Sequence, residues 1–172
     1  MRIADLILAV DVLSIVGEQN TEVDLLTLDS REVKHGSMYA ALKGTQVDGH
    51  QFIDKAIELG ASAILCSEVP NQLLGSVVYI QVADVSKSLG VVASSFYGNP
   101  SESIKVIAVT GTNGKTTCTS LMYDLFTGFG HKCGLLSTVT VRVADETFES
   151  THTTPNAIAV QSYIRKMVDA GC

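Results

Sequence analysis

The sequence predicts an α/β protein in which a small N-terminal α/β domain precedes the start of a second α/β domain. Two observations lead to this fold class. Short apolar runs, of the kind found in buried parallel strands, alternate with segments whose apolar residues recur at helical spacing. In addition, a glycine-rich stretch at 111–117 follows one such run and precedes one such helical segment.

The composition favours a folded protein that binds neither nucleic acid nor membrane. Of the 172 residues 46% are hydrophobic, and the mean hydropathy of +0.28 argues against disorder. The net charge is −6 without a long basic run, so a nucleic-acid-binding surface is not expected. Neither a signal peptide nor a membrane-spanning stretch is recognisable, which predicts a cytoplasmic protein. The four cysteines have no C-x-x-C spacing, and we expect reduced, buried thiols.

Predicted strands and helices alternate through the first part of the chain. In chain order we expect a helix within 1–9, strands over 12–16, 23–28 and 38–42, a helix over 52–59, strands over 63–66 and 77–82, and a helix over 84–96. Asp84 is a suitable N-cap for the last of these helices. The Gly-Asn-Pro-Ser run at 98–101 breaks the pattern, so we place the domain boundary there and expect domains 1–99 and 100–172.

The second domain begins with a strand, a glycine loop and a helix. The strand is predicted over 106–109 and the helix over 117–129. Residues 133–143 are rich in Thr and Val and predict another strand, followed by a hairpin turn at Asp145 and Glu146. A last helix is expected to start with Thr154 as N-cap and Pro155 as first helical residue, and to end at Gly171.

The 111–117 stretch has the residues of a phosphate-binding loop in a shortened form. Gly111 lies three residues ahead of Gly114, whereas the usual pattern has four residues between its first glycine and Gly-Lys. Backbone N–H groups of the loop and the helix N-terminus would face an anion. Lys115 would place a positive charge on the β- and γ-phosphates, and Thr116 a hydroxyl on Mg²⁺. The alternative is a glycine turn that only caps the helix, with Lys115 in solvent.

The residues after the loop lack a second, acidic ligand for Mg²⁺. Such a ligand commonly ends another buried strand, but Asp145 fits a hairpin turn better than that role. One strand, one helix, a second strand and one more helix would also leave bare sheet edges. We therefore expect the sequence to be a fragment that is cut after the helix ending at Gly171.

Four stretches together resemble the Mur ligases of peptidoglycan synthesis, and among them the MurE type. They are TLDSR at 27–31, GTQVDGH at 44–50, GTNGKTT at 111–117 and THTTP at 151–155. Their order and spacing agree with that family along the whole chain, and the shortened phosphate loop is typical of it. The resemblance implies a three-domain enzyme. This chain would hold its UDP-binding N-terminal domain and the opening of its central, ATP-binding domain.

The resemblance also implies roles for individual residues. The residues that would bind the phosphates of ATP are Gly111, Thr112, Asn113, Gly114, Lys115, Thr116 and Thr117. Among these, Lys115 would be catalytic and Thr116 would bind Mg²⁺. The residues that would bind the UDP-containing substrate are Leu28, Ser30, Thr45, Gln46, Val47, Thr153 and Thr154. Without the resemblance, we would interpret Ser30 and Arg31 as a surface turn and 44–49 as a solvated loop.

The reaction that the resemblance implies joins a diamino acid to UDP-MurNAc-L-Ala-D-Glu. ATP would activate the D-glutamate carboxylate as an acyl phosphate, and the amine of the diamino acid would attack it to give an amide, ADP and phosphate. We favour meso-diaminopimelate over L-lysine, expect a monomer, and expect this chain alone to be inactive. Two further alternatives are a MurF-type ligase and a nucleotide-binding module without catalytic activity.

Overall fold

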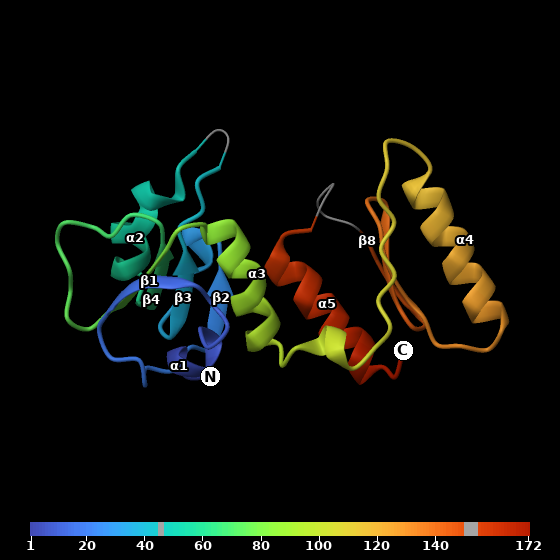
Figure 1. Cartoon of the computed structure of the whole chain (residues 1–172), viewed down its shortest axis with the longest axis horizontal. Coiled ribbons are helices and arrows are strands. Elements are labelled where there is room, and N and C mark those ends of the chain that lie inside the picture. Colours follow the sequence, from blue (N-terminus) through green and yellow to red (C-terminus); the bar gives the residue numbers. More distant parts are fainter. Residues whose placement is uncertain (45–46, 150–154) are drawn as a thin grey trace. The chain divides into compact units, whose positions relative to one another are not determined.

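The computed structural model describes residues 1–44, 47–149 and 155–172. Contacts divide the chain into two units, Met1–Phe96 and Tyr97–Cys172, each with its own sheet (Figure 1). The division falls at the end of a helix, shortly before the break at 98–101. Among the described residues, no helix combines the length and the apolar character needed to span a bilayer.

The first unit is built on a five-stranded sheet. Its elements are α1 (Ile3–Leu6), β1 (Val12–Val16), β2 (Leu25–Thr27), η1 (Ser30–Glu32), β3 (Ser37–Ala40), η2 (Gly49–Phe52), α2 (Ile53–Glu58), β4 (Ala61–Cys66), β5 (Val78–Val82) and α3 (Val85–Phe96). The strand order is β1-β5-β4-β3-β2, in which β2 to β5 are parallel and β1 is antiparallel to β5. The predicted α/β class is confirmed. Each strand expected in this part is present, with ends shifted by about one or two residues.

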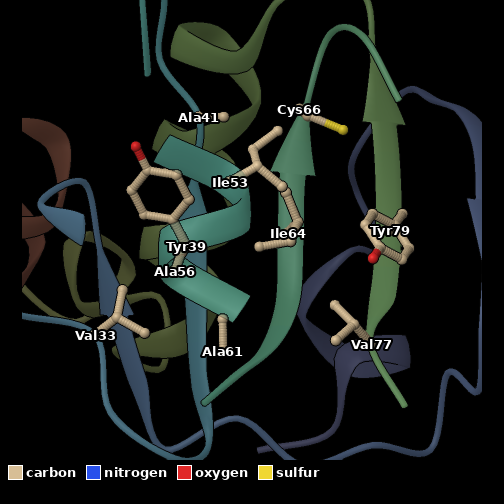
Figure 2. Close-up of a cluster of buried hydrophobic side chains, with 10 residues drawn as sticks. All are labelled: Val33, Tyr39, Ala41, Ile53, Ala56, Ala61, Ile64, Cys66, Val77 and Tyr79. Carbon is tan, nitrogen blue, oxygen red and sulfur yellow. The ribbon is translucent and has the colours of Figure 1, made fainter. Parts of the chain in front are cut away.

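Both faces of this sheet are buried. Tyr39 of β3 pairs with Ile64 of β4, and Ile64 pairs with Tyr79 of β5, so the three side chains form a row across one face. Figure 2 shows this row beside α2, with which it shares a buried cluster. Strand residues that alternate with this row are fully buried as well: Met38, Leu65 and Ile80. Burial on both faces explains why these strands are continuous apolar runs in the sequence.

The second unit combines a three-stranded antiparallel sheet with two longer helices. Its elements are η3 (Pro100–Glu102), α4 (Lys115–Gly128), β6 (Gly134–Leu136), β7 (Thr140–Val143), β8 (Glu146–Glu149) and α5 (Ala157–Asp169). The strand order is β6-β7-β8. Val141 and Val143 pack with Met167 of α5 in a buried cluster. A side chain at Gly134 would collide with Met167, which shows how closely α5 approaches β6.

The strand predicted over 106–109 is wrong. No described residue pairs with this segment, and the side chains of Val106 and Ile107 are 57% and 59% exposed. An apolar run becomes a strand only where a neighbouring strand satisfies its backbone N–H and C=O groups. The sequence pattern reports the apolar character of a segment, and it contains no information on whether a partner strand is adjacent.

The single strand predicted over 133–143 is also wrong, because a turn divides it into β6 and β7. Ser137 closes this turn: its Oγ accepts hydrogen bonds from the N–H groups of Val139 at 3.3 Å and Thr140 at 3.1 Å, and donates to the Thr140 carbonyl at 2.8 Å. A hairpin turn follows β7 as predicted, one residue earlier than expected, since Val143 pairs with Glu146.

Helix α5 starts at a different cap from the predicted one. The Oδ1 atom of Asn156 accepts a hydrogen bond from the Ala159 N–H at 2.9 Å, so Asn156 is the N-cap. Pro155 precedes this cap, and Thr154 lies outside the described residues. The predicted end is confirmed: Gly171, with φ of 76°, follows the last helical turn.

The four cysteines are free thiols, as expected. The expected burial is confirmed for Cys66, and this burial raises the pKa of its thiol to about 11. The expected burial is wrong for Cys118, which is exposed like most of α4, a helix that buries none of its residues.

Candidate functional site

The loop at 111–117 adopts a backbone conformation that requires its glycines. Gly111 has φ of 149° and Gly114 has φ of 80°, values that residues with a side chain rarely adopt. Gly114 is also the N-cap of α4, and its carbonyl accepts the hydrogen bond of the Cys118 N–H at 2.9 Å. The N–H groups of the first helical turn, which have no partner within a helix, therefore lie at this loop and can bind an anion.

Lys115 is the first residue of α4, and its side chain bends back onto the loop. Its Nζ donates hydrogen bonds to the carbonyl oxygens of Gly111 at 2.5 Å and of Thr112 at 3.3 Å. The positive charge thus lies beside the same backbone that would surround a phosphate. Because Lys115 is exposed, side-chain torsions alone can turn its ammonium group toward a phosphate oxygen.

A cavity of about 530 Å³ adjoins the loop, a size typical of small-molecule sites. It is lined by Val109, Thr112, Asn113, Gly114, Lys115, Thr116, Thr117, Thr119, Leu136, Ser137, Thr138, Pro155 and Val160. The structure therefore brings six of the seven predicted loop residues to one cavity, and leaves Gly111 outside its lining. Lys115 is the one charged residue among the described lining residues. The cavity is suited to an anionic ligand such as a phosphate ester.

Seven of the described lining residues were not among the predicted site residues, and Ser137 and Thr138 are two of them. Ser137 and Thr138 lie in the turn between β6 and β7. This turn borders the cavity but contains no recognisable sequence motif. In the sequence they are part of a Thr- and Val-rich run that predicts a continuous strand. The Ser137 hydroxyl, which closes the turn, is only a weak local signal, and the pairing of β6 with β7 determines where the turn lies.

The described residues offer few ligands for a metal ion. Within residues 1–44, 47–149 and 155–172, no three His, Cys, Asp or Glu side chains gather into a potential metal site. The described lining of the cavity includes the Thr116 hydroxyl and no carboxylate. This set of donors fits a Mg²⁺ ion held largely by phosphate oxygens and water, a common arrangement for this ion.

In the first unit, the residues predicted to bind the UDP part follow the ends of neighbouring strands. Leu28 and Ser30 come after β2, and Val47 lies in the connection that follows β3. Since β2 and β3 are adjacent and parallel, these segments leave the sheet at the same edge, where α/β sheets usually bind ligands. Leu28 and Ser30 are half-buried, and Val47 is 53% exposed. The other predicted residues of this set lie outside the described ones: Thr45, Gln46, Thr153 and Thr154.

Asp29 closes the turn that carries Ser30. Its carboxylate accepts hydrogen bonds from the Arg31 backbone N–H at 2.9 Å and from the Arg31 Nη2 at 2.6 Å. The side-chain hydrogen bond from Arg31 is the main reason why the pKa of Asp29 is lowered to about 2. Among the described residues the Ser30 hydroxyl has no hydrogen-bond partner, so the turn fixes Asp29 and Arg31 and leaves Ser30 free for a ligand.

The carboxylates of Asp29 and Asp48 both influence Tyr39. The Tyr39 hydroxyl donates to the Gly49 carbonyl at 2.9 Å, and burial is the main cause of its raised pKa, with contributions from the charges of Asp29 and Asp48. The backbone and side-chain hydrogen bonds from His50 lower the pKa of Asp48. The segments after β2 and β3 therefore lie near each other around one buried hydroxyl.

Two parts of the chain match the Mur ligases. Residues 22–97 match the Mur ligase family, catalytic domain, and residues 109–172 match the Mur ligase middle domain. The chain belongs to the Mur ligase family. The resemblance inferred from the four sequence stretches is thereby confirmed.

Individual Mur ligases are similar to this chain along its whole length. Two proteins named UDP-N-acetylmuramoyl-L-alanyl-D-glutamate--2,6-diaminopimelate ligase, from Bacteroides fragilis and Cytophaga hutchinsonii, are each 44% identical to it. The similarity covers 100% of this chain and 36% of each of those proteins. The chain therefore spans about a third of the length of these Mur ligases.

Solved Mur ligase structures share the fold. A structure of UDP-N-acetylmuramoyl-L-alanyl-D-glutamate--2,6-diaminopimelate ligase matches 100% of this chain and 34% of its own, with a TM-score of 0.73 and 20% identity. MurF from Acinetobacter baumannii matches 84% of this chain and 28% of its own, with a TM-score of 0.54 and 19% identity. At these identities the likeness concerns the fold alone.

Proposed function

We propose that this chain is part of an ATP-dependent ligase that adds meso-diaminopimelate to UDP-MurNAc-L-Ala-D-Glu. The observation that carries the proposal is the 44% identity, along the full chain, to the Bacteroides fragilis protein named as a 2,6-diaminopimelate ligase. That name is also the reason for preferring meso-diaminopimelate to L-lysine. The activity is assigned to the full-length enzyme, since the chain spans 36% of that relative.

The glycine loop and its cavity support the ATP-dependent half of the proposal. The N–H groups at the start of α4 and the Lys115 ammonium would bind the phosphates, and the Thr116 hydroxyl would hold Mg²⁺ together with phosphate oxygens. A bound Mg²⁺ ion supplies charge neutralisation when phosphate is transferred. Lys115 contributes in the same way, by positioning and by stabilising negative charge on the oxygens between the β- and γ-phosphates.

The edge of the first sheet supports binding of the UDP part of the substrate. Leu28 and Ser30 after β2, and Val47 after β3, would contact this part, and Thr45 and Gln46 would extend the same site. Contacts to the muramoyl-peptide part are assigned to two other residues, Thr153 and Thr154. The monomeric state and the cytoplasmic location expected from the sequence stay predictions.

The full-length enzyme tests this proposal directly. It is incubated with ATP, Mg²⁺ and UDP-MurNAc-L-Ala-D-Glu, and with either meso-diaminopimelate or L-lysine, and the products are identified by mass spectrometry. We expect the enzyme to form an amide with meso-diaminopimelate. With L-lysine we expect kcat/KM to be lower by roughly 100-fold or more, because a site that pairs with the second carboxylate of diaminopimelate rejects an analogue without this group. If neither amino acid gives an amide, the proposed activity is contradicted. Preference for L-lysine would contradict only the choice of amino acid.

A further inference from the structure

His50 lies between two loops that leave adjacent strands of the first sheet. Its side chain is 14% exposed, and its Nδ1 is 2.7 Å from the Oδ1 of Asp48. On the other side of the ring, Nε2 lies 3.1 Å from the backbone nitrogen of Ser67 and 3.4 Å from that of Glu68. Asp48 belongs to the loop after β3, and Ser67 follows the last residue of β4. The imidazole therefore ties the loop after β3 to the end of β4.

The partners of the ring fix the role of each nitrogen. Backbone N–H groups can only donate, so Nε2 accepts from Ser67 and Nδ1–H donates to the Asp48 carboxylate. The Ser67 Oγ also lies 3.1 Å from Nε2, which gives the atom order of a Ser-His-Asp hydrolase site. In such a site Nε2 must be free to take the serine proton, whereas here it already accepts a backbone N–H. The geometry therefore favours a structural connection over a nucleophile.

Gly49 fixes the same loop to the end of β3. Its N–H donates to the Leu42 carbonyl at 2.9 Å, and its carbonyl accepts from the Tyr39 hydroxyl at 2.9 Å. A Cβ atom at Gly49 would lie 2.7 Å from the Leu42 carbonyl oxygen, so only glycine allows this approach. The loop is thus attached to β3 through Gly49 and to β4 through His50.

We propose that His50 is a positioning residue for uridine-nucleotide binding, because it holds the loop after β3, and with it Val47, at the edge of the sheet where Leu28 and Ser30 lie. This inference rests on the proposed function. Val47 is close to the attachment point: the Gly44 N–H donates to its carbonyl at 3.0 Å, and Asp48, the next residue, accepts from the His50 backbone N–H at 3.0 Å and its ring. Thr45 and Gln46 are outside the described residues and play no part here.

The test measures UDP binding to the 172-residue chain by isothermal titration calorimetry. We expect His50→Ala to weaken binding roughly tenfold or more, because a loop that is no longer preorganised must be ordered when the ligand binds. His35, exposed in the turn before β3, gives the matched control His35→Ala, which should bind UDP like the wild type. Thermal unfolding followed by circular dichroism establishes that each variant is folded.

Two conservative variants keep the test decisive if His50→Ala does not fold. In His50→Gln the amide oxygen can still accept from the Ser67 N–H, whereas in His50→Asn the shorter side chain can reach only Asp48. We expect His50→Gln to retain more UDP affinity than His50→Asn, since the link to β4 positions the loop. In the full-length enzyme, His50→Gln and His50→Asn should raise the KM for the nucleotide substrate and leave kcat and the KM for ATP unchanged.

Different results overturn different claims. If the wild-type chain binds UDP and folded His50→Ala binds it within about twofold of the wild type, the positioning role is wrong and the proposed function stands. If the wild-type chain does not bind UDP, the nucleotide site and the positioning role both fail. Covalent labelling of Ser67 by a fluorophosphonate probe would contradict the positioning role by showing a reactive serine.

Discussion

Asp29 is a single residue whose ionisation is coupled to folding. Its pKa is lowered from 3.8 to about 2, chiefly by the side-chain hydrogen bond from Arg31. A carboxyl group with a lower pKa in the folded than in the unfolded state stabilises the fold where it is ionised in both states. This contribution is therefore fully present above about pH 4 and is lost as the pH falls through the folded value near 2. It is modest, because Arg31 is 87% exposed and water screens the pair.

The variant Asp29→Asn tests this coupling. We expect its free energy of unfolding to fall less between pH 4 and pH 2 than that of the wild type, because the titrating group is gone. Urea unfolding monitored by circular dichroism at several pH values measures the difference. Asp11→Asn, a change at an exposed carboxylate, serves as the control and should keep the wild-type pH dependence. The same pH dependence in Asp29→Asn and the wild type would contradict the coupling.

Local motifs explain which site residues could be predicted from the sequence. Lys115 and Thr116 are recognisable because the glycines beside them determine both the loop and the start of α4. The connection from Asp48 through His50 to Ser67 could not be predicted, because Ser67 meets the ring only when β3 and β4 pair. The sequence separates His50 and Ser67 by a helix and a strand, and neither residue belongs to a pattern that includes the other.

At the scale of elements, α4 differs from the other long helices. It buries none of its residues: the side chains of Leu121 and Leu125 are 64% and 53% exposed, and that of the C-cap Phe129 is 69% exposed. Helix α5, in contrast, buries Ile164 and Met167. The helical spacing of apolar residues predicted both helices, but the separation of apolar from polar residues around the helix is much weaker in α4 than in α5. The stability of the second unit is therefore expected to depend on α5 and little on α4.

Two alanine substitutions compare these helices. Leu125→Ala should change the free energy of unfolding of the 172-residue chain by less than about 0.5 kcal/mol, because it removes an exposed side chain. Met167→Ala should lower it by about 2 kcal/mol or more, because it leaves a cavity beside Val141 and Val143. Urea unfolding of the two variants measures both values. Equal losses in the two variants would show that α4 is packed against other residues in solution.

The elements of the first unit were predicted better than those of the second, for a physical reason. Parallel strands buried on both faces have continuous apolar runs, so the sequence alone identifies them. In the second unit, the turn at Ser137 and the unpaired segment 106–109 depend on which backbone groups find partners. Hydrophobic patterns do not report backbone pairing, and the two wrong strand predictions follow from that gap.

At the scale of the whole molecule, the chain carries two separate candidate sites. The first unit offers the strand ends around Leu28, Ser30 and Val47, and the second offers the glycine loop with its cavity. The proposed reaction needs both, because the nucleotide-linked carboxylate must receive the γ-phosphate of ATP. With about a third of the length of its Mur ligase relatives, the chain is expected to bind ligands without forming the amide.

The most direct test of the proposed enzyme is ADP release by the full-length protein, with Lys115→Ala as the variant and the exposed Lys105→Ala as control. We predict that the wild type releases ADP over repeated turnovers in proportion to amide, and that this turnover requires both UDP-MurNAc-L-Ala-D-Glu and meso-diaminopimelate. Lys115→Ala should lower the rate by roughly 100- to 1,000-fold, because it removes charge stabilisation at the transferred phosphate, while Lys105→Ala should keep it. An unchanged rate of ADP release in Lys115→Ala would contradict the assignment of the glycine loop as the ATP site.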